Sequence, residues 1–369
     1  MQDIAKYKRQ IHDIPVVAIT GSVGKTSTKD LIASVVSQEF DTLKTKGNYN
    51  NHIGLPLTLL ELNNQQAAVV EMGMNHLGEI SVLANIAKPT IAVITNIGTA
   101  HIGLLGSKQN ILKAKLEILD GLEQDGLIIL NNDDKLLNSA LNEINHKVYT
   151  YGIENKSDLN AYNIKLNEQD STFNIKINQK EYTINVPMAG KHFIYNALCA
   201  ISVGLNLNIS IEKIINGIKN FKPSKLRMNI IETKENIKII NDTYNASYDS
   251  VKSVLEVLKN MKARRKIAVL GDVLELGEHA KKLHEQIGIQ VVKNQIDILM
   301  TLGQNSKFIA NKAVESGMKE ENVFSFDEKE ELISKIKQIS NQDDIILFKA
   351  SRGMELDKVV ENITKGDKK

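Results

Sequence analysis

The sequence predicts an α/β protein of two domains: a P-loop domain with a mostly parallel sheet and a small antiparallel appendage, then a Rossmann-like domain. Apolar segments typical of buried strands alternate with helical segments through both halves of the chain. A glycine-rich turn joins the first of these strands to a helical segment. The 369 residues exceed what one hydrophobic core usually organises, so we expect two domains.

Continuous apolar runs mark the strands of the first half, as expected when helices cover both faces of a parallel sheet. The strands fall at residues 16–20, 67–71, 91–95 and 127–131, and the helices at 25–37, 80–87 and 108–121. Residues 159–187 differ, because polar and apolar residues alternate in 162–166 and 172–177. This alternation predicts an antiparallel appendage with one face in water.

A proline at position 223 lies in segment 220–224, where we expect a hinge between domains 1–222 and 223–369. Beyond it a second strand–helix series begins. Its strands fall at 237–241, 266–271, 296–302, 323–326 and 345–349, with helices such as 250–261 and 278–293 between them. In such folds ligands bind at the carboxyl ends of the strands, so we expect the site there and between the domains.

Composition excludes several classes of protein. The net charge of +2 gives no electrostatic argument for nucleic-acid binding. The single cysteine, Cys199, cannot form an internal disulfide and lies in an apolar helical run, so we expect it to be buried. The chain opens without an apolar signal core and has no run long enough to span a bilayer. We expect a cytoplasmic monomer.

The turn after the first strand carries the most specific motif. Gly21 and Gly24 allow a tight turn whose N–H groups point inward, which suits a polyphosphate. Lys25 is placed to reach the terminal phosphates, and the hydroxyl of Thr26 is placed to bind Mg²⁺. Ile19 replaces the first glycine of the full Walker pattern, but the strand before and the helix after support a nucleotide site. Its binding residues are Gly21, Ser22, Val23, Gly24, Lys25, Thr26 and Ser27.

Two further strand ends supply metal-ligand side chains. Glu71 closes the strand at 67–71, and His101 follows the strand at 91–95. Parallel strands bring both ends to the edge that carries the P-loop. Each residue alone is more often an ordinary surface or loop residue, and His101 is the less conventional Mg²⁺ ligand because that ion prefers oxygen.

Two other features are ambiguous on pattern alone. Lys115 lies in a helical segment where a solvated face is the simpler interpretation. Asn48, Asn50 and Asn51 form a turn-rich stretch that is either a plain loop or a set of amide donors for a polar substrate.

Seven segments occur in an order that resembles the Mur ligase family of ATP-dependent amide-bond ligases in peptidoglycan synthesis. They are 20–28, 71–73, 95–97 with 100–101, 114–117, 190–192 with 196–198, 241–246 and 270–277. The likeness runs from about residue 1 to 360, and it is strongest to the branch that adds D-alanyl-D-alanine to UDP-N-acetylmuramoyl-tripeptide. It implies an ATP-binding central domain at 1–222 and the family's C-terminal domain at 223–369.

The resemblance also implies residue roles. Mg²⁺ ions would bind Thr26, Glu71, His101 and Lys115, the last matching the family lysine that CO₂ carbamylates. Catalysis would depend on Lys25, Lys115, His101 and Arg227. ATP would further contact His192, Asn196, Arg227, Asp242 and Tyr244. The substrates, UDP-N-acetylmuramoyl-tripeptide and D-alanyl-D-alanine, would meet Asn48, Asn50, Asn51, Asn245, Lys349, Ser351 and Arg352.

The chain departs from the family pattern in three places. Ala350 stands where the family usually has glycine, and Tyr248 stands where it usually has proline. Full-length family members carry a UDP-sugar-binding domain before the P-loop, where this sequence has only residues 1–19. We therefore expect either a truncated chain or a natural short form.

Two alternatives stay open. The P-loop, Glu71 and His101 do not separate this branch from other amide ligases of the family, such as folylpolyglutamate synthase. A non-catalytic nucleotide switch is the second alternative, because residues 155–158 spell the guanine-reading Asn-Lys-x-Asp. No Asp-x-x-Gly occurs to sense a γ-phosphate, which argues against the switch.

Overall fold

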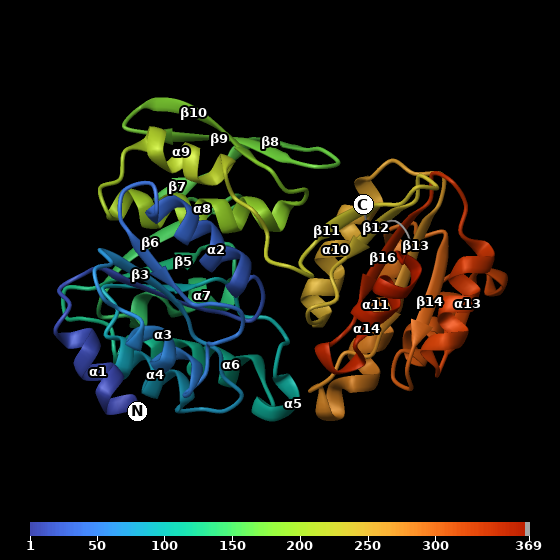
Figure 1. The fold of residues 1–369 in the computed structure, drawn as a ribbon, viewed down its shortest axis with the longest axis horizontal. Helices are drawn as coiled ribbons and strands as arrows, with labels where there is room; N and C mark the ends of the chain where they lie inside the picture. Colours follow the sequence, from blue (N-terminus) through green and yellow to red (C-terminus); the bar gives the residue numbers. More distant parts are fainter. Residues whose placement is uncertain (366–369) are drawn as a thin grey trace. The chain divides into compact units, whose positions relative to one another are not determined.

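The computed structural model describes residues 1–365 and divides into two compact units, Met1–Lys222 and Pro223–Lys369 (Figure 1). Each unit contains its own parallel or mostly parallel sheet covered by helices. Within the described residues, no helix is long and apolar enough to cross a membrane.

Sheet A, the centre of the first unit, has seven parallel strands in the order β2-β3-β1-β4-β5-β6-β7. Their bounds are β1 Val16–Thr20, β2 Thr42–Lys44, β3 Ala67–Glu71, β4 Ile91–Ile94, β5 Leu127–Asn131, β6 Lys147–Gly152 and β7 Leu159–Asn160. The chain leaves β1 toward β2 on one side and later reaches β4 on the other. The strand order thus reverses at β1, and α/β sheets bind ligands at the carboxyl ends of strands where such a reversal occurs.

Helices cover both faces of sheet A (Figure 1). One face carries α2 Lys25–Val36, α8 Lys191–Asn206 and, outside them, α9 Ile211–Lys219. The other face carries α1 Gln2–Gln10, α3 Gly54–Leu60, α4 Glu79–Ala87 and α6 Lys108–Leu116, while the shorter α5 Ile102–Leu105 and α7 Lys135–Ala140 follow β4 and β5. All five residues of β1 and of β3 are buried, as their apolar runs predict.

The antiparallel appendage is sheet B, formed by β8 Tyr162–Leu166, β9 Ser171–Ile177 and β10 Lys180–Val186. Phe173 and Ile175 are fully buried while Asn174 between them is partly exposed, so the predicted alternation is confirmed. Cys199 is fully buried in α8, also as predicted.

The second unit is built on sheet C, in the order β11-β12-β16-β13-β14-β15. All its pairings are parallel except that of β11 with β12. The strands are β11 Asn229–Glu232, β12 Lys238–Asn241, β13 Lys266–Gly271, β14 Ile298–Leu302, β15 Val323–Phe326 and β16 Ile345–Lys349. The helices are α10 Tyr248–Asn260, α11 Ala280–Lys293, α12 Lys307–Glu315, α13 Lys329–Ile339 and α14 Leu356–Ile363. Buried side chains of α13 and α14, including Leu332 and Val359, pack on one face of this sheet.

Several predicted boundaries differ from the observed ones, and two of the differences have a clear local reason. Strand β4, expected at 91–95, ends at Ile94, and the Thr95 hydroxyl beyond it donates to the Val23 carbonyl at 2.8 Å. The helix expected to run to residue 121 ends at Leu116 and continues as a 3₁₀ turn. There the Glu117 carboxylate leaves the helix surface to accept from the Gly78 N–H at 2.7 Å.

Candidate active site

The P-loop has the backbone that its glycines predict. Gly21 and Gly24 have φ of 146° and 84°, values that only glycine adopts freely. A Cβ at Gly21 would lie 2.0 Å from the Thr95 hydroxyl oxygen, so no side chain fits there. Lys25 opens α2, and its Nζ donates to the Gly21 carbonyl at 2.8 Å. The lysine is therefore folded over its own loop, at the helix N-terminus where an anion is favoured.

The segment that follows β4, the strand next to β1, holds the P-loop in place through hydrogen bonds. Thr95 Oγ1 and Asn96 Nδ2 each donate to the Val23 carbonyl at 2.8 Å, and the Val23 N–H donates to Asn96 Oδ1 at 3.0 Å. From the sequence, Thr95 was taken as the end of a strand and 95–97 as one of the family segments, with no role in holding the loop. The signal that could have found this role was their position after the strand that pairs with β1.

Glu71 ends β3, beside the P-loop strand, since it pairs in register with Ile19. It is only 2% exposed, and its two carboxylate oxygens differ. Oε1 accepts from Asn50 Nδ2 at 2.8 Å, whereas Oε2 has no hydrogen-bond partner among the described residues. A buried carboxylate oxygen without a donor is costly unless a cation completes it. Glu71 thus offers one oxygen to a metal.

His101 and Lys115 lie close enough to the P-loop lysine for its charge to act on them. Burial, then the charges of Lys25 and Lys115, lower the pKa of His101 to about 3, so its imidazole is neutral. His101 has a φ of 64°, a left-handed conformation that is uncommon for a residue with a side chain and recurs at functional sites.

Lys115 is fully buried, and its Nζ makes no hydrogen bond to any described residue. Burial, then the charge of Lys25, holds the pKa of Lys115 well below its usual value. The solvated helix face that the pattern favoured is therefore wrong. The structure instead brings Lys25, Glu71, His101 and Lys115 together at one edge of sheet A.

No group of three or more His, Cys, Asp or Glu side chains with metal-binding geometry occurs in residues 1–365. A cation at Glu71 would therefore share that carboxylate with oxygens from a ligand. This is the usual arrangement for Mg²⁺ at phosphate sites.

The predicted asparagines have different environments. The Asn50 amide is directed at Glu71, and a Cβ at Gly73 would lie 3.0 Å from its Cγ. Asn51 Oδ1 accepts from the Ile53 and Gly54 N–H groups, so it organises the start of α3. Asn48 lies in the preceding turn, where its carbonyl accepts from the Asn50 N–H at 2.7 Å.

Helix α8 lies beside the P-loop helix. The Thr28 hydroxyl of α2 donates to Asn196 Oδ1 at 3.1 Å, and a Cβ at Gly24 would approach the same oxygen within 3.3 Å. His192 lies one turn earlier on α8, with its ring centroid 4.5 Å from that of Phe193. Asn196, one of the two α8 residues predicted to contact a nucleotide, therefore lies beside the P-loop.

Segment 155–158, the guanine-reading candidate, is a structural turn. Asn155 donates its backbone N–H to Asp133 Oδ1 at 2.7 Å and its amide to the Asn132 carbonyl at 2.9 Å. The Asp158 carboxylate accepts from both the N–H and the hydroxyl of Thr150 at 2.7 Å. Because these polar groups bond to their own surroundings, the geometry gives no support to guanine recognition.

In the second unit, several predicted residues meet at the carboxyl ends of β12 and β16. Lys349 is 3% exposed, and its Nζ donates to Asp242 Oδ2 at 2.6 Å and to the Asn245 carbonyl at 3.0 Å. Burial lowers the pKa of Lys349, and the charge of Asp242 opposes that effect. The guanidinium of Arg227 lies 4.1 Å from the ring centroid of Tyr244, a cation–π contact.

The end of β16 also explains the unusual alanine. Ala350 is fully buried, and its Cβ lies 2.7 Å from where a Cβ of Gly271 would be, so the glycine leaves room for the methyl group. Ser351 Oγ accepts from the Leu274 N–H at 2.9 Å. Arg352 is largely exposed and donates to Asp357 at 2.9 Å.

Tyr248 is tolerated in place of proline because it is the first residue of α10, where a backbone N–H needs no helical partner. Ser247 caps the helix instead, since its hydroxyl accepts from the Ser250 N–H.

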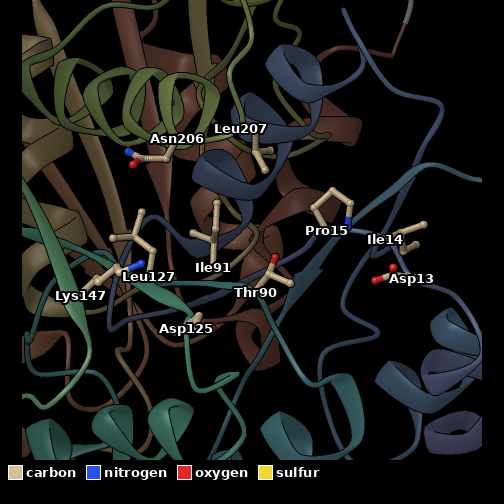
Figure 2. A pocket seen from close by; sticks show the side chains of 10 residues that line it. All are labelled: Asp13, Ile14, Pro15, Thr90, Ile91, Asp125, Leu127, Lys147, Asn206 and Leu207. Carbon is tan, nitrogen blue, oxygen red and sulfur yellow. The ribbon is translucent and has the colours of Figure 1, made fainter.

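A cavity of about 430 Å³ lies at the opposite edge of sheet A (Figure 2). Pro15, Thr90 and Leu127, which precede or open β1, β4 and β5, line it. It contains none of the predicted site residues.

Comparison with known proteins identifies the family. Residues 19–204 match the Mur ligase middle domain, and residues 226–352 match the Mur ligase glutamate ligase domain. The chain belongs to the Mur ligase family.

A Bacillus subtilis relative, UDP-N-acetylmuramoyl-tripeptide–D-alanyl-D-alanine ligase, is 39% identical over 98% of this chain and 79% of its own length. A crystal structure of MurF from Acinetobacter baumannii matches with a TM-score of 0.90 at 32% identity, covering 99% of this chain and 80% of that one. MurF from Thermotoga maritima in complex with ADP matches with a TM-score of 0.88 at 26% identity, over 99% of this chain and 82% of its own. The two α/β units are therefore those of a Mur ligase.

Proposed function

We propose that this Mur ligase is an ATP-dependent, ADP-forming enzyme of peptidoglycan synthesis that joins D-alanyl-D-alanine to UDP-N-acetylmuramoyl-tripeptide. The observation that carries the proposal is the meeting of Lys25, Glu71, His101 and Lys115 at the P-loop edge of one sheet. The similarity of the whole chain to ligases named for this reaction supplies the substrates.

The P-loop is the proposed phosphate site. Its N–H groups and the α2 N-terminus favour an anion, and Lys25 is already folded over the loop. We propose that Lys25 moves from the Gly21 carbonyl to the γ-phosphate when ATP binds. His192 and Asn196 are proposed to contact the adenine side of the nucleotide.

The donor set fits a magnesium ion. Thr26 supplies a hydroxyl at the start of α2, and Glu71 supplies a buried oxygen with no donor. A bound Mg²⁺ would neutralise charge that develops on the transferred phosphoryl group. His101, kept neutral by its surroundings, has an uncharged imidazole to offer a second ion.

Lys115 fits the carbamylation that its family position implies. Burial and the charge of Lys25 lower the pKa of this amine, so its neutral form, which is nucleophilic toward CO₂, is more accessible than in an exposed lysine. The reaction forms an N–C bond and releases a proton, which converts the side chain into an anion. An anionic oxygen ligand beside Lys25 and Mg²⁺ would be favoured where an ammonium is not.

The proposed reaction has two steps. A carboxylate oxygen of the tripeptide attacks the γ-phosphorus, the bond to ADP breaks, and an acyl phosphate forms. The amine of D-alanyl-D-alanine then attacks the acyl carbon, loses a proton and expels phosphate as the amide forms. Lys25 stabilises the negative charge on the transferred phosphoryl group in the first step. Holding both reactants together supplies most of the remaining rate acceleration.

For the second unit we propose that Arg227, Asp242 and Tyr244 contact ATP and that the segment around Asn245, Ser351 and Arg352 receives D-alanyl-D-alanine. The buried Lys349–Asp242 pair would hold that segment in place. Because the reaction consumes ATP, we expect it to take place in the cytoplasm.

Release of inorganic phosphate tests this function. With ATP, Mg²⁺, UDP-N-acetylmuramoyl-tripeptide and D-alanyl-D-alanine present, we expect phosphate release that stops when any one is omitted. Lys25→Ala should abolish it, and near-normal turnover in that variant would contradict the assignment. Replacing the substrates with a folate and glutamate tests the other amide ligases, which the named relatives do not favour.

A further inference from the structure

Lys29, a buried lysine outside the proposed site, connects the P-loop helix α2 to Glu71, the proposed metal ligand. Lys29 lies on α2 four residues after Lys25 and is 2% exposed. Its Nζ donates to the Thr45 carbonyl at 2.9 Å, and the Thr45 hydroxyl accepts from the Glu71 N–H at 3.0 Å. This chain of two contacts joins α2 to the residue that ends β3.

The contacts exist because β2 is short. It ends at Lys44, so beyond that residue the β2 side of β3 has no strand partner. Thr45 still donates its N–H to the Val69 carbonyl at 3.1 Å, but its own carbonyl and the Glu71 N–H are left over. Buried backbone groups need partners, and here the Lys29 ammonium and the Thr45 hydroxyl provide them.

We propose that Lys29 is a positioning residue for the metal site: through Thr45 it fixes the backbone of Glu71 relative to the P-loop. This inference rests on the proposed function, because it assumes a metal–nucleotide complex at that edge. The Asn50 amide occupies Oε1 of the carboxylate, which leaves Oε2 as the oxygen that would hold a cation. Residues that orient a metal ligand typically contribute about 10–100-fold to metal affinity or activity.

Burial of an ammonium is costly, so the position of Lys29 calls for a reason. Asp30 supplies part of the compensation, since its Oδ1 lies 3.1 Å from Lys29 Nζ. The same oxygen lies 3.0 Å from Nζ of Lys44, a lysine that is 48% exposed in its side chain. The Lys44 ammonium therefore shares the carboxylate, but it is Lys29 and not Lys44 that donates to the Thr45 carbonyl, which makes Lys44→Met a matched control.

The experiment measures Mn²⁺ binding to the complex of the full chain with ADP, by electron paramagnetic resonance, and ADP binding without metal by calorimetry. We expect Lys29→Met to weaken Mn²⁺ binding by about 10-fold while metal-free ADP binding is unchanged. Thr45→Val, which removes the acceptor of the Glu71 N–H, should show the same defect, and Thr45→Ser should retain wild-type Mn²⁺ binding. Lys44→Met should match the wild type in both measurements.

Wild-type Mn²⁺ affinity in a folded Lys29→Met variant would overturn the inference, as would equal losses of metal-dependent and metal-free binding. If Lys29→Met does not fold, Thr45→Val decides the matter by the same criterion. Failure of the wild-type protein to bind ADP with Mn²⁺ would instead refute the proposed function.

Discussion

Substitution of Gly21 by alanine tests the P-loop geometry most sharply. Gly21 has a φ of 146°, and an added Cβ would lie 2.0 Å from Thr95 Oγ1. The same hydroxyl donates to the Val23 carbonyl at 2.8 Å, so Thr95 cannot move away without giving up a bond that holds the loop. The substitution therefore strains the backbone and also breaks the hydrogen bond that holds the loop to the segment after β4.

The expected cost follows from these three effects. The backbone conformation costs alanine about 1–3 kcal/mol, the lost hydrogen bond about 1 kcal/mol and the steric conflict about 1–3 kcal/mol. A single shift of the loop would relieve part of all three effects, so their costs do not simply add. We expect the first unit to lose about 3–5 kcal/mol of unfolding free energy. Gly78→Ala is the matched control, because Gly78 has a φ of 88° but nothing within 4 Å of its Cβ position. It should cost only about 1 kcal/mol.

Hydrogen exchange read by mass spectrometry along a urea series suits this test, because peptides from 1–222 report on the first unit by itself. The double variant Gly21→Ala, Thr95→Ala should recover part of the loss, since the methyl group then has space. A Gly21→Ala cost no larger than that of Gly78→Ala, or a double variant with purely additive losses, would refute the steric argument.

Three further predictions concern charge. The pKa of His101 is about 3 in the folded state, against an ordinary value near 6.5, so between these pH values only the unfolded chain takes up its proton. The unfolding free energy of the first unit should therefore fall on acidification by up to about 1.4 kcal/mol per pH unit. Urea titrations at several pH values should show a shallower fall in His101→Gln. If the pH dependence of the variant equals that of the wild type, the lowered pKa of His101 is contradicted. Lys349→Met leaves Asp242 buried without its cation and should cost the second unit about 3–5 kcal/mol of unfolding free energy, measured by hydrogen exchange. The double variant Lys349→Met, Asp242→Asn should recover much of that loss. No recovery would rule out the unpaired charge as the cause. Incubation with ¹³CO₂ should give a carbamate signal by nuclear magnetic resonance that Lys115→Arg lacks, and a signal that persists in the variant would place the modification elsewhere.

Strands β1, β3, β4 and β5 of the first sheet could be predicted because their patterns are local. Segments 16–20, 67–71 and 127–131 are runs of apolar residues, and all three are strands with those bounds. Strands β2, β6 and β7 were missed. Strand β7 was assigned to the antiparallel appendage, but it pairs in parallel with β6. The short β2 gives no periodicity over three residues, and its place depends on pairing with β3. Thr45 and Lys29 were missed for the same reason, since their roles arise only where β2 ends.

Side-chain roles were harder to predict than their positions. Lys115 lies where the family motif places it, yet its pattern favoured a solvated face; only the packing of α6 shows that it is buried. Asn50 was expected to meet a substrate, but its amide bonds to Glu71 in this structure. A sequence records that a polar residue is present, whereas its partner depends on which loops the sheet brings together.

Transfer of labelled oxygen tests the central claim most directly. UDP-N-acetylmuramoyl-tripeptide carrying ¹⁸O in its terminal carboxylate would be converted in the presence of ATP, Mg²⁺ and D-alanyl-D-alanine, and the released phosphate analysed by mass spectrometry. Because we propose that a carboxylate oxygen attacks the γ-phosphorus, the phosphate should carry the label in proportion to the amide formed. Amide formation with unlabelled phosphate would contradict activation of the carboxylate at the P-loop edge.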